Sequence, residues 1–157
     1  MAERSFKNIG TTIEQIRLSA PTVQEIPFGI KTPMSLSAKG NPYTMNTSVT
    51  AQIQDNLKNL LLTNWGERVG IYDYGANLRS VLAEYTNNSD VETIVMQSIV
   101  RAVDKYMSIV SLDTFDMEFL KPDEKCGLAR YQIIVNYSIP KLNEKNQKVK
   151  IILEVMG

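Results

Sequence analysis

The sequence predicts an α+β domain of three helices packed against a three-stranded antiparallel sheet, preceded by an extended N-terminal arm. Three observations lead to this prediction. Apolar residues recur at helical spacing between residues 47 and 106. They alternate with polar residues between 110 and 155, as in strands that bury one face. Before residue 47, prolines interrupt every stretch long enough to form a helix.

The composition is that of one globular domain. The chain has 157 residues, of which 43% are apolar, which is enough for a single core. Seventeen basic and seventeen acidic residues cancel, so no overall field draws the protein to nucleic acid or to an anionic membrane. The single Cys126 excludes an internal disulfide, and with no histidine we expect no zinc site, metal or cofactor.

The cysteine usage fits assembly in a reducing cytoplasm. No segment approaches the ~20 continuous apolar residues needed to cross a bilayer. The N-terminus also lacks the apolar run of a secretory signal. We therefore expect a protein that neither spans a membrane nor is exported by that route.

Residues 1–46 are predicted to form the arm and residues 47–157 the domain. The prolines that interrupt the arm also restrict the residues before them to extended backbone; they are Pro21, Pro27, Pro33 and Pro42. The segment 26–30 is apolar enough to dock on the core or on a neighbouring protein. The alternative is a wholly disordered tail.

The first helix is expected to begin near Thr47 or Ser48, either of which can cap a backbone N–H, and to run to about Asn64. Its apolar face consists of Ile53, Leu57, Leu60 and Leu61. A short second helix is expected over residues 76–85, with Leu78, Val81, Leu82 and Tyr85 on one face.

The third helix is predicted to begin at Ser89, because Ser89 and Glu92 have the spacing of a capping box. Its apolar positions are Val91, Ile94, Val95, Ile99, Ala102, Val103 and Tyr106. After it the period becomes strand-like, and a change of phase predicts a bulge near Asp113 and Thr114. We expect a meander of three strands at residues 110–119, 129–139 and 149–155. Polar turns are expected between them at residues 121–127 and 140–147.

The connector between the first two helices carries the most specific motif. It reads Gly66-Glu67-Arg68 and, after five residues, Tyr74-Gly75. With its flanking leucines, this string resembles the signature of the baseplate wedge proteins of contractile-tailed bacteriophages, a lysozyme-like family related to a baseplate subunit of the type VI secretion system. The positions that match are Leu60, Leu61, Leu62, Thr63, Gly66, Glu67, Arg68, Tyr74, Gly75 and Leu78. With the order of elements included, the resemblance covers roughly residues 47–140.

The resemblance implies a non-enzymatic structural part of the tail baseplate, present in several copies in a symmetric virion assembly built in the host cytoplasm. Its partners would be other wedge proteins and the tail sheath, with no nucleic acid and no membrane. A subunit of a type VI system or of an extracellular injection particle is the nearest variant. In the family, the sheet accepts arms of the first sheath ring by strand addition, and so initiates the sheath.

The last strand, Lys148 to Val155, has the alternation that such an edge requires, although Lys148 and Lys150 could instead protect an ordinary edge. We also predict that deleting residues 148–157 leaves the fold largely intact and abolishes sheath initiation. The family's Glu-Pro-Arg clamp for neighbouring wedge proteins falls where this chain reads Met107-Ser108-Ile109. Either Met107 and Ile109 hold the neighbours by apolar contact, or the bundle of wedge proteins is organised differently here. The predicted partner-interface residues are Tyr106, Met107, Ile109, Val149, Ile151, Leu153 and Val155.

Two other functions stay open at this point. A histidine-based nucleophilic triad is excluded because the chain has no histidine. A peptidoglycan hydrolase would need two carboxylates, for which Glu67 and Asp73 are the candidates within the motif. Arg68 beside Glu67 would keep a carboxylate ionised and make it a poor general acid. A generic adaptor domain is the other alternative.

The motif residues also have structural explanations. Gly66 can adopt the left-handed conformation that ends a helix, and Glu67 can accept hydrogen bonds from backbone donors of a following turn. Arg68 can bind carbonyls or carboxylates, of its own chain or of a neighbour. Gly75 permits a tight path into the second helix, and we expect Tyr74 to pack on the core rather than contact a partner.

Overall fold

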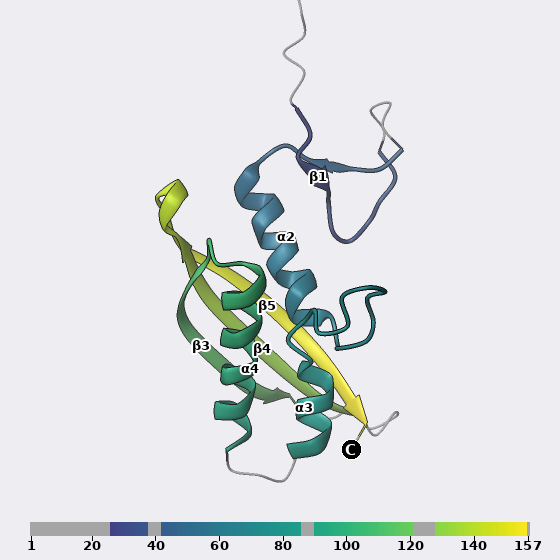
Figure 1. The fold of residues 1–157 in the computed structure, drawn as a ribbon, viewed down its shortest axis with the longest axis vertical. Coiled ribbons are helices and arrows are strands. Elements are labelled where there is room, and N and C mark those ends of the chain that lie inside the picture. The colour runs from purple at the N-terminus through teal and green to yellow at the C-terminus, as the bar shows by residue number, and fades with distance from the viewer. Residues whose placement is uncertain (1–25, 38–41, 86–89, 121–127, 157) are drawn as a thin grey trace, which may run out of the picture.

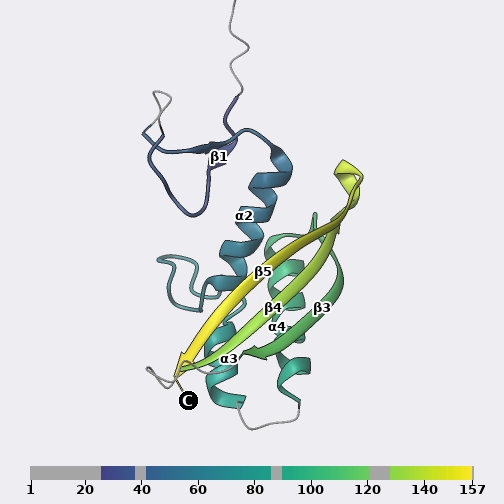
Figure 2. The same ribbon diagram turned by 180° about the vertical axis from the view of Figure 1, so that it is seen from behind.

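The computed structural model describes residues 26–37, 42–85, 90–120 and 128–156. Three helices cover one face of an antiparallel sheet with the strand order β3-β4-β5, as Figure 1 shows. The predicted α+β class is confirmed. The helices are α2 (Val49–Leu62), α3 (Leu78–Tyr85) and α4 (Val91–Tyr106), and the strands are β3 (Ser111–Leu120), β4 (Leu128–Ile139) and β5 (Glu144–Met156). The opposite face of the sheet carries no helix (Figure 2).

The core lies between the sheet and the three helices. Side chains of β4 alternate between this core and the uncovered face, and Ile133 and Tyr137 are fully buried. The helices meet them with the predicted apolar faces, in which Leu57, Leu82 and Val95 are also fully buried. Apolar periodicity therefore identified the buried side of each of these elements.

The last strand is part of the core, which overturns one prediction. Val149, Ile151, Leu153 and Val155 are all buried against the helices. Truncating one large buried aliphatic side chain costs about 2–5 kcal/mol, and a whole domain is stable by only about 5–15 kcal/mol. Deleting residues 148–157 would therefore unfold the domain, so the prediction that the fold survives this deletion was wrong.

The strand pairing follows the prediction, with one boundary displaced. The register shifts between Leu112 and Thr114, which confirms the bulge. The turn after β4 is a short 3-10 helix, Pro140–Leu142, closed by Asn143 in the left-handed conformation. Because this turn is tight, β5 already begins at Glu144 and is longer than expected. The predicted turn at 121–127 lies outside the described residues.

The helix boundaries differ from the predicted ones by about one half-turn. Ser48 is the N-cap residue of α2, as predicted, but its side chain makes no capping hydrogen bond. The helix ends at Leu62 rather than near Asn64, because Thr63 is extended and its hydroxyl donates to the Asn59 carbonyl at 2.6 Å. The Thr63 amide donates to the same carbonyl at 3.1 Å, so this carbonyl accepts two bonds from Thr63.

The other two helices begin later than predicted. A left-handed Asn77 precedes α3, so this helix starts at Leu78 rather than at residue 76. Asp90, not Ser89, is the N-cap residue of α4. The predicted capping box was therefore misplaced, and Ser89 itself lies outside the described residues.

The described part of the arm forms a small layer beside the N-terminal half of α2, away from the large sheet (Figure 1). In it, β1 (Gly29–Ile30) pairs antiparallel with β2 (Met45–Asn46). Asp55 of α2 holds this layer, because its carboxylate accepts from the Thr32 amide at 2.9 Å and from the Asn46 side chain at 2.8 Å. The sequence did not predict this strand pair, which is too short to show a period.

Candidate protein interface

The connector between α2 and α3 folds back on itself. The Glu67 carboxylate accepts from the backbone and side-chain nitrogens of Asn64, at 2.9 and 2.8 Å. These bonds, the backbone bond first, hold the pKa of Glu67 below its usual value. The Gly66 amide donates to the Tyr72 carbonyl at 2.7 Å and closes the loop. Glu67 therefore does accept from a backbone donor, but that donor precedes it, whereas the sequence predicted donors in a following turn.

The two motif glycines have different roles. Gly66 is left-handed, with φ of 84°, but it lies within the connector after α2 has ended, so it does not end the helix as predicted. Gly75 has φ of 110°, and a Cβ there would collide with the Thr63 carbonyl. The close return of the chain is held by the Ala76 amide, which donates to the Leu60 carbonyl at 3.1 Å. Gly75 therefore serves the tight path that the sequence predicted.

An aromatic and cationic stack joins the connector to α4. The Arg68 guanidinium lies 3.8 Å from the centroid of the Tyr74 ring. On the core side, the Tyr74 and Tyr106 centroids are 4.9 Å apart. Tyr74 is half-buried and packs on the core, as predicted. Arg68 contacts the Tyr74 ring, whereas the sequence predicted that it would bind a carbonyl or a carboxylate.

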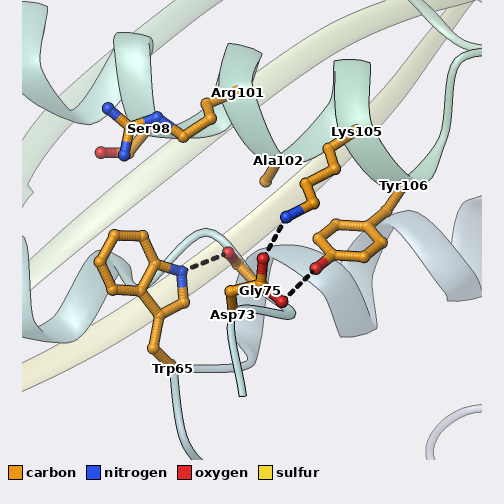
Figure 3. A pocket seen from close by; sticks show the side chains of 8 residues that line it. All are labelled: Trp65, Asp73, Gly75, Ser98, Arg101, Ala102, Lys105 and Tyr106. Carbon is orange, nitrogen blue, oxygen red and sulfur yellow. Dashed lines mark hydrogen bonds and ion pairs between the residues drawn. The ribbon is translucent and has the colours of Figure 1, made fainter. Parts of the chain in front are cut away.

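Asp73 anchors the connector to the C-terminal end of α4 (Figure 3). The Tyr106 hydroxyl donates to its carboxylate at 2.8 Å, and the Lys105 ammonium forms an ion pair with it. The bond from Lys105, followed by that from Tyr106, lowers the pKa of Asp73. The same carboxylate raises the pKa of Lys105, and partial desolvation and the hydrogen bond raise the pKa of Tyr106.

A pocket of about 260 Å³ lies between the connector and α4. Trp65 forms one wall, and its indole N–H donates to the Gly75 carbonyl at 3.0 Å, which fixes the ring (Figure 3). Ala102 lies at the base, and Arg101 and Ser98 extend along α4 away from Asp73. The sequence analysis missed this pocket, because residues 65 and 101 meet only through the fold.

The predicted partner-interface residues lie in three kinds of place. Tyr106 belongs to the Asp73 cluster, Met107 is half-buried against the core, and Ile109 is exposed. The side chains of Val149, Ile151, Leu153 and Val155 point into the core. A strand that pairs with β5 would therefore contact its backbone and the side chains of the uncovered face, rather than these four.

The outer edge of β5 is bordered by a groove of about 370 Å³. Gln54 of α2 donates to the Lys148 carbonyl at 3.2 Å, which shows that this carbonyl points away from β4. Because backbone groups alternate along a strand, those of Lys150 and Ile152 also point outward. Lys58 and Leu62 of α2 form the facing wall of the groove.

Exposed apolar side chains gather in two further places. On the connector, Val69 is 98% exposed and Tyr72 is 71% exposed. On the N-terminal layer, Ile26, Phe28 and Leu36 are exposed, so the apolar segment 26–30 does not dock on the core of its own chain. Groups of exposed large apolar residues are typical of surfaces that contact other proteins.

The described residues contain no group of three or more metal-ligating side chains. Within the same part of the chain, no helix is both long and apolar enough to cross a bilayer. The two candidate acids for hydrolysis, Glu67 and Asp73, are both committed to hydrogen bonds, and both have lowered pKa values.

Comparisons with known proteins find similarity to solved structures alone. No protein-family model matches the chain, and no curated protein matches it. A crystal structure provisionally described as a tail lysozyme of Geobacter sulfurreducens is 19% identical, with a TM-score of 0.49, over 71% of this chain and 93% of that one. A chain of the cryo-EM structure of the anti-feeding prophage baseplate is 14% identical, with a TM-score of 0.48, over 81% of this chain and 82% of that one.

Proposed function

We propose that this protein is a structural component of the baseplate of a contractile tail, which binds neighbouring wedge proteins and initiates the sheath by strand addition. The connector is the observation that carries the proposal. Its sequence resembles the wedge signature, and its motif residues maintain a folded connector: Glu67 binds Asn64, Arg68 stacks on Tyr74, and Gly75 lies against Thr63. Residues used in this way build a scaffold.

The two acids support this proposal over a hydrolase. A glycosidase needs a general acid that stays protonated near neutral pH, so the pKa of one carboxyl must be raised. The pKa values of Glu67 and Asp73 are instead lowered by their donors. We expect purified protein to leave peptidoglycan intact, and lysis that disappears in both Glu67→Gln and Asp73→Asn would favour the hydrolase.

The edge of β5 supports the sheath role. Strand addition requires outward backbone groups beside a groove that can receive side chains. Lys150 and Ile152 offer such groups, and the groove against Leu62 lies beside them. The Ile152 side chain is 51% exposed and on the uncovered face, where an added strand would extend the surface.

An edge-blocking variant tests the sheath role in place of the deletion. Ile152→Pro removes an outward N–H that β4 does not use, a change that edge strands tolerate. Ile152→Ala is the matched control, since it shortens the same side chain and keeps the N–H. We expect contractile tails with Ile152→Ala and baseplates without sheath with Ile152→Pro. Normal tails from an Ile152→Pro protein that melts like the control would refute strand addition at this edge.

A pull-down tests the assembly role as a whole. The tagged protein would be recovered from cells that produce the complete particle, and the co-purifying proteins identified by mass spectrometry. Recovery of sheath and wedge proteins is the expected result. If a folded, soluble bait recovers neither, the baseplate proposal fails and the adaptor alternative gains support.

A further inference from the structure

The pocket beside α4 is lined by a positive charge, that of Arg101, with no ion-pair partner among the described residues. Lys105 is already paired with Asp73, so these two charges cancel at one end. Arg101 lines the same pocket and makes no hydrogen bond or ion pair with any described residue. In Figure 3 its guanidinium extends away from the Asp73 cluster, on the side where Ser98 lies. The pocket therefore has one positive end with unused donors.

The shape of the pocket restricts what it can hold. Its volume of about 260 Å³ is enough for one side chain and too small for a folded element or several sugar rings. Trp65 offers a ring face that is held in place through its bond to the Gly75 carbonyl. An aliphatic stem can pack against such a face while its polar end reaches Arg101.

We propose that this pocket receives the carboxylate side chain of an aspartate or glutamate from a neighbouring protein. Arg101 would bind both carboxylate oxygens with its planar fork, and the Ser98 hydroxyl would donate a further bond. The identity of the partner as a baseplate protein rests on the proposed function, whereas the chemistry of the pocket does not.

A carboxylate fits better than a nucleic-acid phosphate. Nucleic-acid binding relies on several cations along a track and on a positive field. Here a single unpaired arginine is available, the carboxylate of Asp73 lines the same pocket, and the charges of the chain sum to zero. A single side-chain carboxylate requires no more than one arginine fork.

Trp65 provides a direct test, because it is the only tryptophan of the chain. Its indole N–H gives one NMR signal, which would be followed while N-acetyl-Ala-Glu-Ala-amide is added to the full-length protein at millimolar concentration. We expect a saturable shift with this peptide and none with N-acetyl-Ala-Gln-Ala-amide. Equal responses to the two peptides, or no response to either, would overturn the proposal.

Two variants locate the effect. Arg101→Gln should abolish the shift, whereas Arg79→Gln, at an exposed position on α3 outside the pocket, should leave it unchanged. Both variants remain on helix surfaces, so their folding can be checked by the unchanged signals of the core amides. A shift that survives Arg101→Gln would overturn the proposal, as would a stronger Arg101-dependent response to a short single-stranded oligonucleotide.

The assembled particle separates this proposal from the proposed function. A photo-cross-linker at Ser98 should capture a partner segment that contains Asp or Glu, and Arg101→Gln should reduce recovery of that partner in the pull-down. Unchanged recovery of all partners by Arg101→Gln would overturn the pocket proposal while the baseplate role stands. If wild-type protein recovers no partner, the baseplate role fails, and the peptide titration alone decides the chemistry of the pocket.

Discussion

Asp73 and Tyr106 lie 33 positions apart and are joined by a hydrogen bond of 2.8 Å from the Tyr106 hydroxyl to the Asp73 carboxylate. This bond ties the connector motif to the C-terminal end of α4. The same carboxylate pairs with Lys105, so we expect the attachment of the connector to α4 to depend on pH.

The ion pair of Asp73 with Lys105 is expected to form at neutral pH. It should be lost in acid, where Asp73 is protonated, and in strong base, where Lys105 is deprotonated. A carboxyl with a lowered pKa contributes stability above its unfolded value of about 3.9 and loses it as the pH falls through the folded value. Lys105 has a raised pKa, so it contributes stability below its unfolded pKa of about 10.4. It loses this contribution as the pH rises through its pKa in the folded protein. An NMR titration of the Asp73 carboxyl should show a midpoint below 3.9.

Tyr106→Phe and Lys105→Met should each move that midpoint back toward the usual value, and Lys105→Met should move it further because its bond is the larger cause. A midpoint for Asp73 that is unchanged in both variants would contradict the cluster.

Replacing two left-handed glycines of the connector, Gly70 and the motif residue Gly75, should have unequal effects. Gly70→Ala places a side chain in open space and costs only the left-handed backbone, about 1–2 kcal/mol. Gly75→Ala adds a collision with the Thr63 carbonyl to the same backbone cost, so it should lower the free energy of unfolding by more. Urea denaturation of both variants measures the difference. Equal losses would show that the chain does not return closely to α2 at this point.

The N-terminal layer should detach from α2 when Asp55 is removed. Asp55→Ala leaves the buried Asn46 side chain with one acceptor fewer, at a local cost of about 1–3 kcal/mol. Faster hydrogen exchange is expected at the Phe28 and Lys31 amides, which bond across the strand pair, while amides of β4 stay protected. Gln54→Ala, at the preceding position of the same helix, is the control, because the Gln54 side chain bonds to the Lys148 carbonyl and not to this layer. Equal exchange in the two variants would disprove the anchoring role.

Removing the buried Tyr137 hydroxyl should not destabilise the protein. This oxygen is buried with no hydrogen-bond partner among the described residues, and burial raises the pKa of Tyr137. Tyr137→Phe keeps the ring and removes the unsatisfied group, so the free energy of unfolding should stay equal or rise by about 1 kcal/mol. Thermal and urea denaturation test this expectation, and a loss of stability above 1 kcal/mol would indicate that the hydroxyl has a partner.

The sequence alone determined the fold class, the buried faces and the antiparallel order of the strands. Periods of 3.6 and of two residues are set by backbone geometry, and they are readable wherever an element is long enough and buries one side. The bulge near Asp113 was predictable for the same reason, because a slip by one residue moves every later side chain to the other face.

Helix ends were less well predicted, because the side chains at the N-cap positions of α2 and α4 make no capping hydrogen bond. The sequence predicted Ser89 as the cap of α4, whereas the N-cap position falls on Asp90. The strand pair β1–β2 was missed because pairs of residues show no period.

Tertiary structure alone decided the partners of each functional side chain. Trp65 and Arg101 reach one pocket, and Asp73 reaches Lys105, because the connector folds back over the end of α4. The sequence also could not show that β5 is both a core strand and an edge strand. Its inward side chains fill the core while its outward backbone groups border a groove, and only the packing of α2 beside it creates that groove.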